Sequence, residues 1–557
     1  MEKTAKPAPK ALFGVSGLDD ILCGGLARNR LYLLEGSPGS GKTTLALQFL
    51  LEGAGAGEKG LYITLSETEE ELREAAASHG WIIPENIDIF ELLPPESLLD
   101  EKQQQSLLYS SDLELGEATN RIFEAMERSK PTRIVLDSLS EIRLLAQSSL
   151  RYRRQILALK HYFAQRDVTV LLLDDMTAEM QDKTVHSVAH GVMRLEELTP
   201  DYGAERRRLR VVKYRGQAFR GGYHDFTILT GGLQVFPRLV AAEYRTRVKS
   251  TVFSTGIAEL DKLMGGGVES GSSTLVIGPA GTGKSLLVLQ FVSAAVNRGE
   301  HAALFIFDEE LGLLFSRAKT MGIDLEAMRD SGALTIVQVD AAEISPGEFA
   351  HKVRAAVEKE NIRTVVIDSL NGYQNAMPQE QSLILHMHEL LQYLNRVGAA
   401  TFLTVAQHGL VGDMKSPVDV TYLADTVILL RYFEAFGQVR RAISMVKKRT
   451  GAHENTIREF TITNAGIIVG PVLEKFQAFC AESHTTLAAP HRRWKSKTVG
   501  HAVGYDLRTR AYSRAARTRR ACRGRNLAGR RVDRRDLRQS ARICEGNRRG
   551  RRRRGAD

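Results

Sequence analysis

Short apolar runs alternate with amphipathic stretches along most of the chain. Four of the apolar runs are short and flanked by turn residues, as strands buried on both faces of a parallel sheet are: "LYLLEG" at Leu31, "GLYITL" at Gly60, "RIVLDS" at Arg133 and "TVLLLDD" at Thr169. Stretches such as "TEEELREAAASHG" separate them and mix polar with apolar residues, as surface helices do. The alternation predicts a doubly wound α/β fold with a mostly parallel sheet.

Later segments show a second pattern. "LRVVKYRG" at Leu209 and "HDFTILTGGLQVF" at His224 are rich in strand-forming residues and are interrupted by Gly-rich turns. "ISMVKKRTG" at Ile443 and "IREFTITNAGIIV" at Ile457 repeat the pattern. These segments predict antiparallel strands joined by hairpins.

The chain is an internal duplication. Its two copies keep the same order of motifs, with offsets that stay within about a dozen residues over a whole domain, which a single repeated loop would not do. We therefore expect two domains, residues 12–237 (the first half) and 251–473 (the second half), with the boundary near residues 238–250. The matched pairs are Lys42 and Lys284 (offset 242), Asp137 and Asp368 (231), and Lys213 and Lys447 (234).

Each half contains one phosphate-binding loop. Residues 36–43 and 278–285 fit the pattern G-x-x-x-x-G-K-[ST], and each follows an apolar strand and precedes a helix. Glycines let backbone N–H groups surround phosphate oxygens, and the helix N-terminus adds partial positive charge. We expect ATP to contact Gly36, Ser37, Pro38, Gly39, Ser40, Gly41, Lys42, Thr43 and Thr44 in the first half, and Gly278, Pro279, Ala280, Gly281, Thr282, Gly283, Lys284, Ser285 and Leu286 in the second.

Acidic residues follow other predicted strands. Asp137 and Asp368 end "RIVLD" and "TVVID", beside the ligand crevice of an open α/β sheet. With Thr43 and Ser285 they are the candidate Mg²⁺ ligands, and a helix N-cap is the alternative role for each Asp. Lys42 and Lys284 are expected to reach the outer phosphates and to act in catalysis.

Hydrolysis also needs a group that orients water on the γ-phosphate. Glu67 and Glu309 follow the second strand of their halves and are the candidates, with Asp308 beside Glu309 as a further acid. Solvated surface acids are the alternative interpretation.

Composition changes this picture only at the C-terminus. The chain has 557 residues, is 43% apolar and 25% charged, and carries a formal charge of +10. Residues 491–557 alone carry 22 Arg and 2 Lys against 5 Asp and Glu, a net +19, which leaves −9 for the rest. We expect residues 480–557 to be a disordered basic tail or an out-of-frame translation, and any nucleic-acid binding to depend on that tail.

The remaining composition excludes several classes. No apolar run of eighteen residues is present, so no membrane-spanning helix is expected. The four cysteines (Cys23, Cys480, Cys522 and Cys544) have neither metal-site nor disulfide-like spacing. The expected location is a reducing cytoplasm.

These motifs together resemble the KaiC family of RecA-like ATPases, which includes the cyanobacterial circadian clock protein. The resemblance covers about residues 12–473. It rests on "GLDDILCGGL", "ELDKLMGGGV", both phosphate loops, both "DSL" strands, "ERRRLRVVKYRG" and "RRAISMVKKRTGAHENTIREFTI". It implies two tandem RecA-like P-loop NTPase domains that bind ATP and Mg²⁺.

The resemblance also implies a homohexamer of two stacked rings with ATP at the subunit interfaces. Lys213 with Arg215, and Lys447 with Arg449, match the basic pair that reaches the γ-phosphate bound by the neighbouring subunit. Lys-x-Arg on one strand places both charges on one face, which agrees with this role. His453 fits the same pattern in the second half, where the first half has Phe219.

The resemblance further implies a Ser/Thr autokinase in the second half. "DVTYLADTVILL" places Thr421 and Tyr422 where the family carries an adjacent Ser-Thr acceptor pair, and Thr426 belongs to the following strand. Thr421 is the expected phosphoacceptor and Glu309 the general base. Tyr422 is too long to replace Thr without moving its oxygen, so a two-site phosphorylation cycle is not expected.

Two other functions fit parts of the sequence. A RecA- or DnaB-like motor would need basic DNA-binding loops, and the acidic body argues against them. A signalling scaffold would use ATP only to hold its ring together, without turnover. Signalling proteins are possible partners under any of these interpretations.

Overall fold

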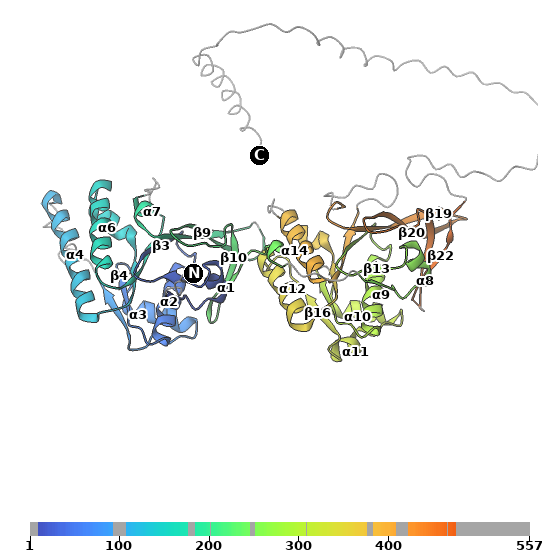
Figure 1. Cartoon of the computed structure of the whole chain (residues 1–557), viewed down its shortest axis with the longest axis horizontal. Coiled ribbons are helices and arrows are strands. Elements are labelled where there is room, and N and C mark those ends of the chain that lie inside the picture. Colours follow the sequence, from blue (N-terminus) through green and yellow to red (C-terminus); the bar gives the residue numbers. More distant parts are fainter. Residues whose placement is uncertain are drawn as a thin grey trace, which may run out of the picture. The chain divides into compact units, whose positions relative to one another are not determined.

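The structure, a computed structural model, describes residues 9–92, 107–176, 184–200, 202–244, 251–307, 309–375, 383–407, 421–464 and 466–474 (Figure 1). The predicted tail at 480–557 and the candidate acid Asp308 lie outside these ranges. The described residues form two nine-stranded sheets and two short two-stranded sheets.

The first half begins with a small two-stranded sheet and continues into the large one. Its elements, in chain order, are β1 (Lys10–Ala11), α1 (Ser16–Ile21), β2 (Leu26–Ala27), β3 (Leu31–Gly36), α2 (Lys42–Gly55), β4 (Gly60–Thr64), α3 (Glu69–Ser78), β5 (Ile87–Glu91), α4 (Leu107–Ser129), β6 (Arg133–Asp137), α5 (Leu139–Ala146), α6 (Ser149–Ala164), β7 (Thr169–Asp174), α7 (Thr184–Val188), β8 (Gly191–Leu198), β9 (Arg206–Tyr214), β10 (His224–Leu229) and β11 (Gly232–Phe236).

A short 3-10 helix, η3 (Ala241–Glu243), precedes the second half. The second half then contains β12 (Val252–Phe253), α8 (Ala258–Leu263), β13 (Val268–Glu269), β14 (Ser273–Gly278), α9 (Lys284–Asn297), β15 (Ala302–Ile306), α10 (Leu311–Lys319), α11 (Leu325–Asp330), β16 (Leu334–Gln338), α12 (Pro346–Glu360), β17 (Thr364–Asp368), α13 (Leu370–Asn375), α14 (Leu383–Val397), β18 (Ala400–Ala406), β19 (Thr426–Ala435), β20 (Gln438–Lys448), β21 (Ile457–Thr463) and β22 (Gly466–Val472).

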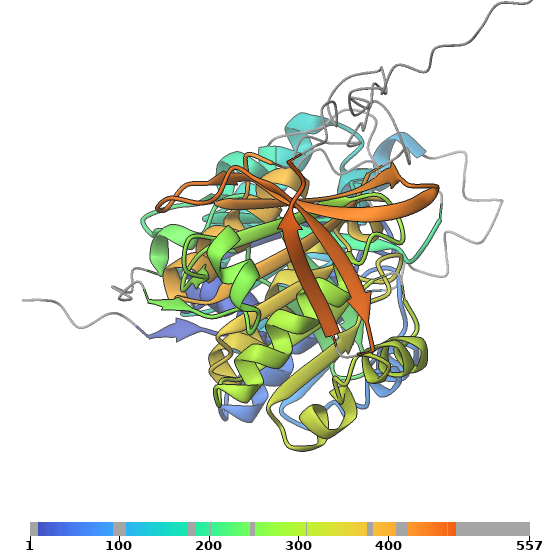
Figure 2. The same ribbon diagram turned by 90° about the vertical axis from the view of Figure 1, so that its right-hand side faces the viewer.

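The two large sheets have the same strand order. The first is β5-β4-β6-β7-β3-β8-β9-β10-β11 and the second β16-β15-β17-β18-β14-β19-β20-β21-β22. In both, the first six strands are parallel to one another, and each of the last three pairs antiparallel with the strand before it. Figure 2 shows the antiparallel strands of the second half, in orange, facing the viewer. The predicted doubly wound fold and its antiparallel extension are confirmed.

Helices cover both faces of each parallel sheet, which is why the central strands are apolar throughout. Every residue of β3 is buried. Tyr32 and Leu34 pack on one face with Phe49 of α2, and Leu31 and Leu33 pack on the other with the core under α4 to α6. Alternate side chains of one strand thus enter two separate cores.

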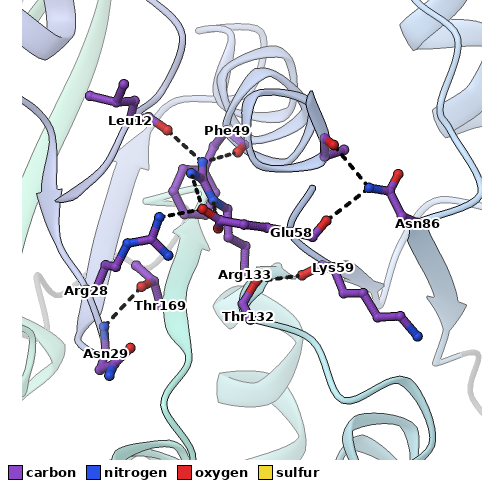
Figure 3. Close-up of polar contacts among 11 residues, drawn as sticks. Leu12, Arg28, Asn29, Phe49, Glu58, Lys59, Asn86, Thr132, Arg133 and Thr169 are labelled. Atoms are coloured by element: carbon purple, nitrogen blue, oxygen red, sulfur yellow. Dashed lines mark hydrogen bonds and ion pairs between the residues drawn. The ribbon is translucent and has the colours of Figure 1, made fainter. Parts of the chain in front are cut away.

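A buried network of charged residues lies where strands β4 and β6 of the first sheet begin (Figure 3). Arg133, at the start of β6, donates to Glu58 Oε2 at 2.7 Å and to the carbonyls of Leu12 and Phe49, each at 2.7 Å. Burial raises the pKa of Glu58, but the hydrogen bonds and charges of Arg133 and Arg28 outweigh it and bring the pKa below its usual value. The opposite charges of Glu58 and the two arginines compensate one another at a buried position, where an unpaired charge would destabilise the fold.

The second half lacks the basic residue of this network. Arg133 lies beside Gly60 in the first sheet, and Thr364 lies beside Ala302 at the matching place in the second. The network is therefore a property of the first half, although the strands around it are duplicated.

Among the described residues, no helix is both long enough and apolar enough to cross a membrane.

His224, at the start of β10, is a buried group that must stay neutral. Its Nε2 lies 3.1 Å from Arg220 O, and its Nδ1 accepts the Arg238 N–H at 2.8 Å. Both ring nitrogens are satisfied by one neutral tautomer, because a proton on Nδ1 would face another donor. Burial lowers the pKa of His224 to about 4.

We expect the first half to lose stability as the pH falls from about 6.5 to about 4. In that range His224 is protonated in the unfolded chain but stays neutral in the folded one, so protonation favours unfolding. The shift corresponds to about 3 kcal/mol over that window. Urea unfolding followed by Trp81 fluorescence in a Trp494→Phe background measures it. His224→Asn retains an acceptor for Arg238 and should lose this part of the pH dependence. Equal pH dependence in the two proteins would contradict the assignment.

Candidate functional site

The first phosphate loop, residues 36–43, connects β3 to α2. Gly39 and Gly41 have φ values of 81° and 93°, which favour glycine. A Cβ on Gly41 would lie 2.7 Å from the side chain of Ile228 on β10. The hairpin of the antiparallel extension therefore packs directly against the loop. Gly283 has the same relation to Ile462 in the second half, where the distance would be 2.6 Å.

The residues of the first loop fit a bound phosphate. Lys42 is folded back, and its Nζ donates to the carbonyls of Gly36 and Ser37, each at 2.9 Å. The hydroxyl of Ser40 is buried without a hydrogen-bond partner in the described structure. A buried lysine whose hydrogen bonds go to backbone carbonyls and a buried hydroxyl without a partner are groups that a nucleotide phosphate would satisfy.

Lys42 also forms an ion pair that sequence reasoning missed. Its Nζ lies 2.9 Å from Asp175 Oδ1, just after β7, and Lys42 is almost completely buried. The signal was present in "LLLDD", where an acid follows a buried strand. Strand register places Ala406 at the equivalent position of the second half, because Leu31 pairs with Val170 and Ser273 with Thr401. The second loop therefore has an uncharged alanine at the position of this carboxylate.

The candidate metal ligands of the first half lie together. Thr43 Oγ1 is 3.5 Å from Asp137 Oδ2, and the same oxygen accepts the Tyr62 hydroxyl at 2.6 Å. Burial raises the pKa of Asp137, and the charge of Asp175 adds to this effect. A hydroxyl and a carboxylate at the end of a phosphate loop fit the oxygen preference of Mg²⁺.

Glu67 follows β4 and is held by its backbone. Its N–H donates to Thr64 Oγ1 at 2.9 Å, and its carbonyl accepts from the same hydroxyl at 2.8 Å. Burial raises the pKa of Glu67, and the charges of Asp137, Glu71 and Asp175 raise it further. Such a carboxylate is a stronger base than an exposed one, as a proton acceptor requires.

Helix α3 begins directly behind Glu67. Thr68 caps it: its hydroxyl accepts from the N–H of Glu71, whose carboxylate accepts from the N–H of Thr68. The capping box fixes the direction in which the chain leaves β4 and so fixes the position of Glu67.

The second loop, residues 278–285, repeats the fold but not every contact. Lys284 Nζ donates to Pro279 O at 2.9 Å, and burial lowers the pKa of Lys284. Asp368 accepts from the hydroxyl of Thr404. Among the described residues, no hydrogen bond joins Ser285 to Asp368, so this candidate metal pair is less closely assembled than its counterpart.

Glu309 forms an ion pair, and no matching contact of the Glu67 carboxylate is found in the described part of the first half. Arg317 Nη2 donates to Glu309 Oε2 at 2.6 Å. Burial nevertheless keeps the pKa of Glu309 above its usual value. Asp308 lies outside the described residues, so its predicted role stays a prediction.

The last residue of each predicted nucleotide-contact segment also contacts other parts of its own half. Thr44 Oγ1 lies 3.3 Å from His79 Nε2, and Leu286 packs against the core of the second half. His453 lies in the loop that follows β20, four residues beyond Arg449. Phe219, at the corresponding place in the first half, packs against the first core.

The two basic pairs lie far from the loops of their own halves. β9 runs antiparallel to β8, so Tyr214 pairs with Gly191, which pairs with Tyr32 near the start of β3. The phosphate loop begins only at Gly36, about 13 Å further along the strand at ~3.3 Å per residue. Lys213 and Arg215 therefore occupy the opposite end of the sheet from Lys42.

Each basic pair holds the segment that precedes the strand beside it. In the second half, Lys447 Nζ donates to the carbonyls of Thr421 (2.9 Å) and Ala424 (2.8 Å), and Arg449 Nη2 donates to Tyr422 O at 3.0 Å. The candidate phosphoacceptor and the basic pair are thus brought together, away from Lys284.

The first half repeats these contacts with other residues. Lys213 Nζ donates to the carbonyls of His186 and, at 2.9 Å, Ala189. Arg215 Nη2 donates to Ser187 O at 2.7 Å. Lys213 pairs with Val192 in the first half as Lys447 pairs with Val427 in the second, so Val192 and Val427 are equivalent positions. Counting back six residues from each makes His186 equivalent to Thr421. Counting back five makes Ser187 equivalent to Tyr422.

Two phosphate loops at the carboxyl ends of parallel strands, each with an acid from a neighbouring strand, define a tandem P-loop ATPase of the RecA-like fold. The family model described as "ATPase: KaiC" matches residues 12–240 and 253–474, and the chain belongs to that family.

Similar proteins extend over most of the chain. The "Circadian clock oscillator protein KaiC" of Parathermosynechococcus lividus is 29% identical over 504 residues, covering 88% of this chain and 91% of the relative. The "Circadian clock protein KaiC3" of Synechocystis sp. is 28% identical over 466 residues, covering 82% and 91%.

We expect Asp175→Ala to bind ATP more tightly at the first loop. The Asp175 carboxylate competes with phosphate for Lys42 and also repels the negatively charged triphosphate, and the substitution removes both effects. A partly buried pair of about 1 kcal/mol corresponds to about fivefold in affinity. Titration with a fluorescent ATP analogue in a Lys284→Ala background, where only the first loop binds, measures the change.

Two control variants accompany this measurement. Asp175→Asn removes the charge but keeps the shape and should behave like the alanine variant. Glu69→Ala removes an exposed acid that pairs with Arg73 and should change nothing. Unchanged or weaker binding by Asp175→Ala would show that Asp175 does not compete with phosphate.

Proposed function

We propose that the chain is an ATPase that assembles as a homohexameric double ring, with each ATP held by the loop of one subunit and completed by the basic pair of the next. We further propose that the second half transfers the γ-phosphoryl group of ATP to Thr421 of the neighbouring subunit. The chain would then be a Ser/Thr autokinase as well as an ATPase.

One observation carries this proposal: the phosphate loop and the basic pair of each half lie at opposite ends of one sheet. A single subunit cannot bring Arg449 to a nucleotide bound at Lys284, because a strand of about 13 Å and the loop itself separate them. A second copy, placed with its basic end against the loop end of the first, supplies the missing charges. The interface implied is head-to-tail and generates a ring when its rotation closes.

The transfer follows from the same placement. Thr421 is anchored to Lys447, so any γ-phosphate that this basic pair reaches also lies near the Thr421 hydroxyl. In transfer, the Thr421 oxygen bonds to the γ-phosphorus, the bond from phosphorus to the bridging oxygen of ADP breaks, and ADP leaves. Glu309 of the neighbouring subunit accepts the hydroxyl proton. Lys284 and Arg449 hold the charge that develops on the phosphoryl oxygens.

Hydrolysis uses the same parts with water in place of the hydroxyl. Glu67 is suited to orient that water in the first half, since its backbone is fixed and its side chain is a strengthened base. Bound Mg²⁺ would neutralise phosphate charge beside Thr43 and Asp137. If the loops only bound ATP, as in the scaffold alternative, purified protein would show no turnover.

The relatives' names point to a regulatory setting. We infer a role in signalling or circadian-type regulation, in the cytoplasm and with protein partners. Residues 480–557, the only strongly basic part of the chain, stay the expected region for any nucleic-acid contact.

Mixed rings test the exchange between subunits. Lys284→Ala subunits lack a working second loop but keep Thr421 and Arg449, and Arg449→Ala subunits have the opposite defect. Each alone should lose Thr421 phosphorylation by a hundredfold or more, on the order of an arginine-finger loss. In an equal mixture, about a quarter of the head-to-tail interfaces are complete.

The labelled subunit decides the result. With subunits of different tag length and γ-labelled ATP, we expect label on the Lys284→Ala subunit, which cannot phosphorylate itself. The first-half loops stay intact in both variants, so ring assembly does not depend on the substitutions. Label confined to the Arg449→Ala subunit would show transfer within one subunit and overturn the proposal.

A further inference from the structure

Ser187 lies in residues 186–189, the segment before β8 that corresponds to residues 421–424 before β19. Arg215 holds its carbonyl as Arg449 holds that of Tyr422, so the two residues are structurally equivalent. Tyr422 is half-exposed, with 50% of its surface accessible, and Ser187 is exposed too. The first half therefore presents a short aliphatic hydroxyl where the second half presents a long phenol.

The side chain next to Ser187 is already engaged. His186 Nε2 lies 2.7 Å from Glu35 Oε2, and Glu35 is buried and also paired with Arg194. The Ser187 hydroxyl instead donates to a backbone carbonyl one turn earlier, Thr184 O, at 2.7 Å. Such a contact is released by a rotation about χ1, which leaves the Ser187 oxygen free to act as a nucleophile.

A cationic cavity lies beside Ser187. Its volume is about 280 Å³, and its lining includes the three cations of Arg30, Lys160 and Arg215, the imidazole of His190 and no acidic residue. In the described part of the chain, Arg30, Lys160 and Arg215 donate their side-chain hydrogen bonds to backbone carbonyls rather than to carboxylates. The cavity is thus positive and not neutralised, as a site for a phosphate group would be.

The second half has lost this charge excess. Asp425 stands where the first half has His190, and its carboxylate lies 3.3 Å from Arg449. It also accepts from the N–H of Ser273 at 3.0 Å and from Asn395 at 3.1 Å. By charge alone, the first half is therefore the better place to hold a phosphorylated side chain.

We propose that Ser187 is a phosphoacceptor of the first half and receives the γ-phosphoryl group of ATP bound at residues 36–43 of the neighbouring subunit. The proposal rests on the head-to-tail assembly proposed above. It assigns to the first half a second reaction besides hydrolysis.

The reaction is a simple displacement. The Ser187 Oγ bonds to the γ-phosphorus as the bond between phosphorus and the bridging oxygen of ADP breaks, and ADP leaves. The hydroxyl proton passes to the Glu67 carboxylate of the neighbouring subunit. The phosphoserine dianion that forms is held by the guanidinium of Arg215 and by the cations of the adjacent cavity.

Phosphosite mapping of the full chain tests the proposal. In a Lys284→Ala background the second loop cannot donate a phosphoryl group, and γ-labelled ATP should still label Ser187. Ser187→Ala should lower this label at least tenfold, whereas Ser187→Thr, which keeps a hydroxyl, should retain it. Lys42→Ala should abolish it, because the donor is the first loop.

Three outcomes would overturn the proposal. Acid-labile label would place the phosphoryl group on His186 as a phosphoramidate. Label on Ser187 that persists in Lys42→Ala would exclude the first loop as donor. Absence of label from Ser187, with Thr421 labelled in the wild type, would leave the autokinase proposal standing and remove this one; the reverse pattern would remove the Thr421 assignment instead.

Discussion

The polarity of the parallel sheet is the constraint on which the rest of the structure depends. Phosphate loops form where parallel strands end, because the following helix N-terminus lies there. The antiparallel return of β9 and β20 carries the basic pairs to the other end. Because the phosphate loop and the basic pair are separated in this way, the site proposed above needs two subunits. The direction of the strands alone separates the phosphate loop from the basic pair, and neither motif has to change in sequence for that separation.

Duplication preserved the backbone more strictly than the chemistry around it. Both halves keep nine strands in the same order and one phosphate loop each. They also keep the same lysine and arginine contacts to backbone carbonyls before β8 and β19. The charged neighbours differ. Asp175 reaches Lys42 in the first half alone, Arg317 holds Glu309 in the second, and Asp425 replaces a histidine beside the basic pair. The two halves thus share a geometry and differ in electrostatics.

Sequence reasoning predicted what depends on neighbouring residues in the chain. The strands, the loops at 36–43 and 278–285, and the acid at the end of β6 follow from short local patterns. Asp175 was missed because its contact with Lys42 depends on the pairing of β7 with β3, which brings together residues 133 positions apart. The equivalence of Ser187 and Tyr422 was missed because it is expressed in backbone carbonyl contacts, and side-chain identity conceals it.

The pairing of Lys42 with Asp175 places a carboxylate at the first phosphate loop, where we predict that it competes with an arriving triphosphate for the lysine. Ala406, at the equivalent position beside the second loop, carries no charge. If Asp175 weakens ATP binding as predicted, the second loop fills at lower ATP concentrations than the first. Two loops of unequal affinity would respond over a wider range of ATP concentrations than two identical loops.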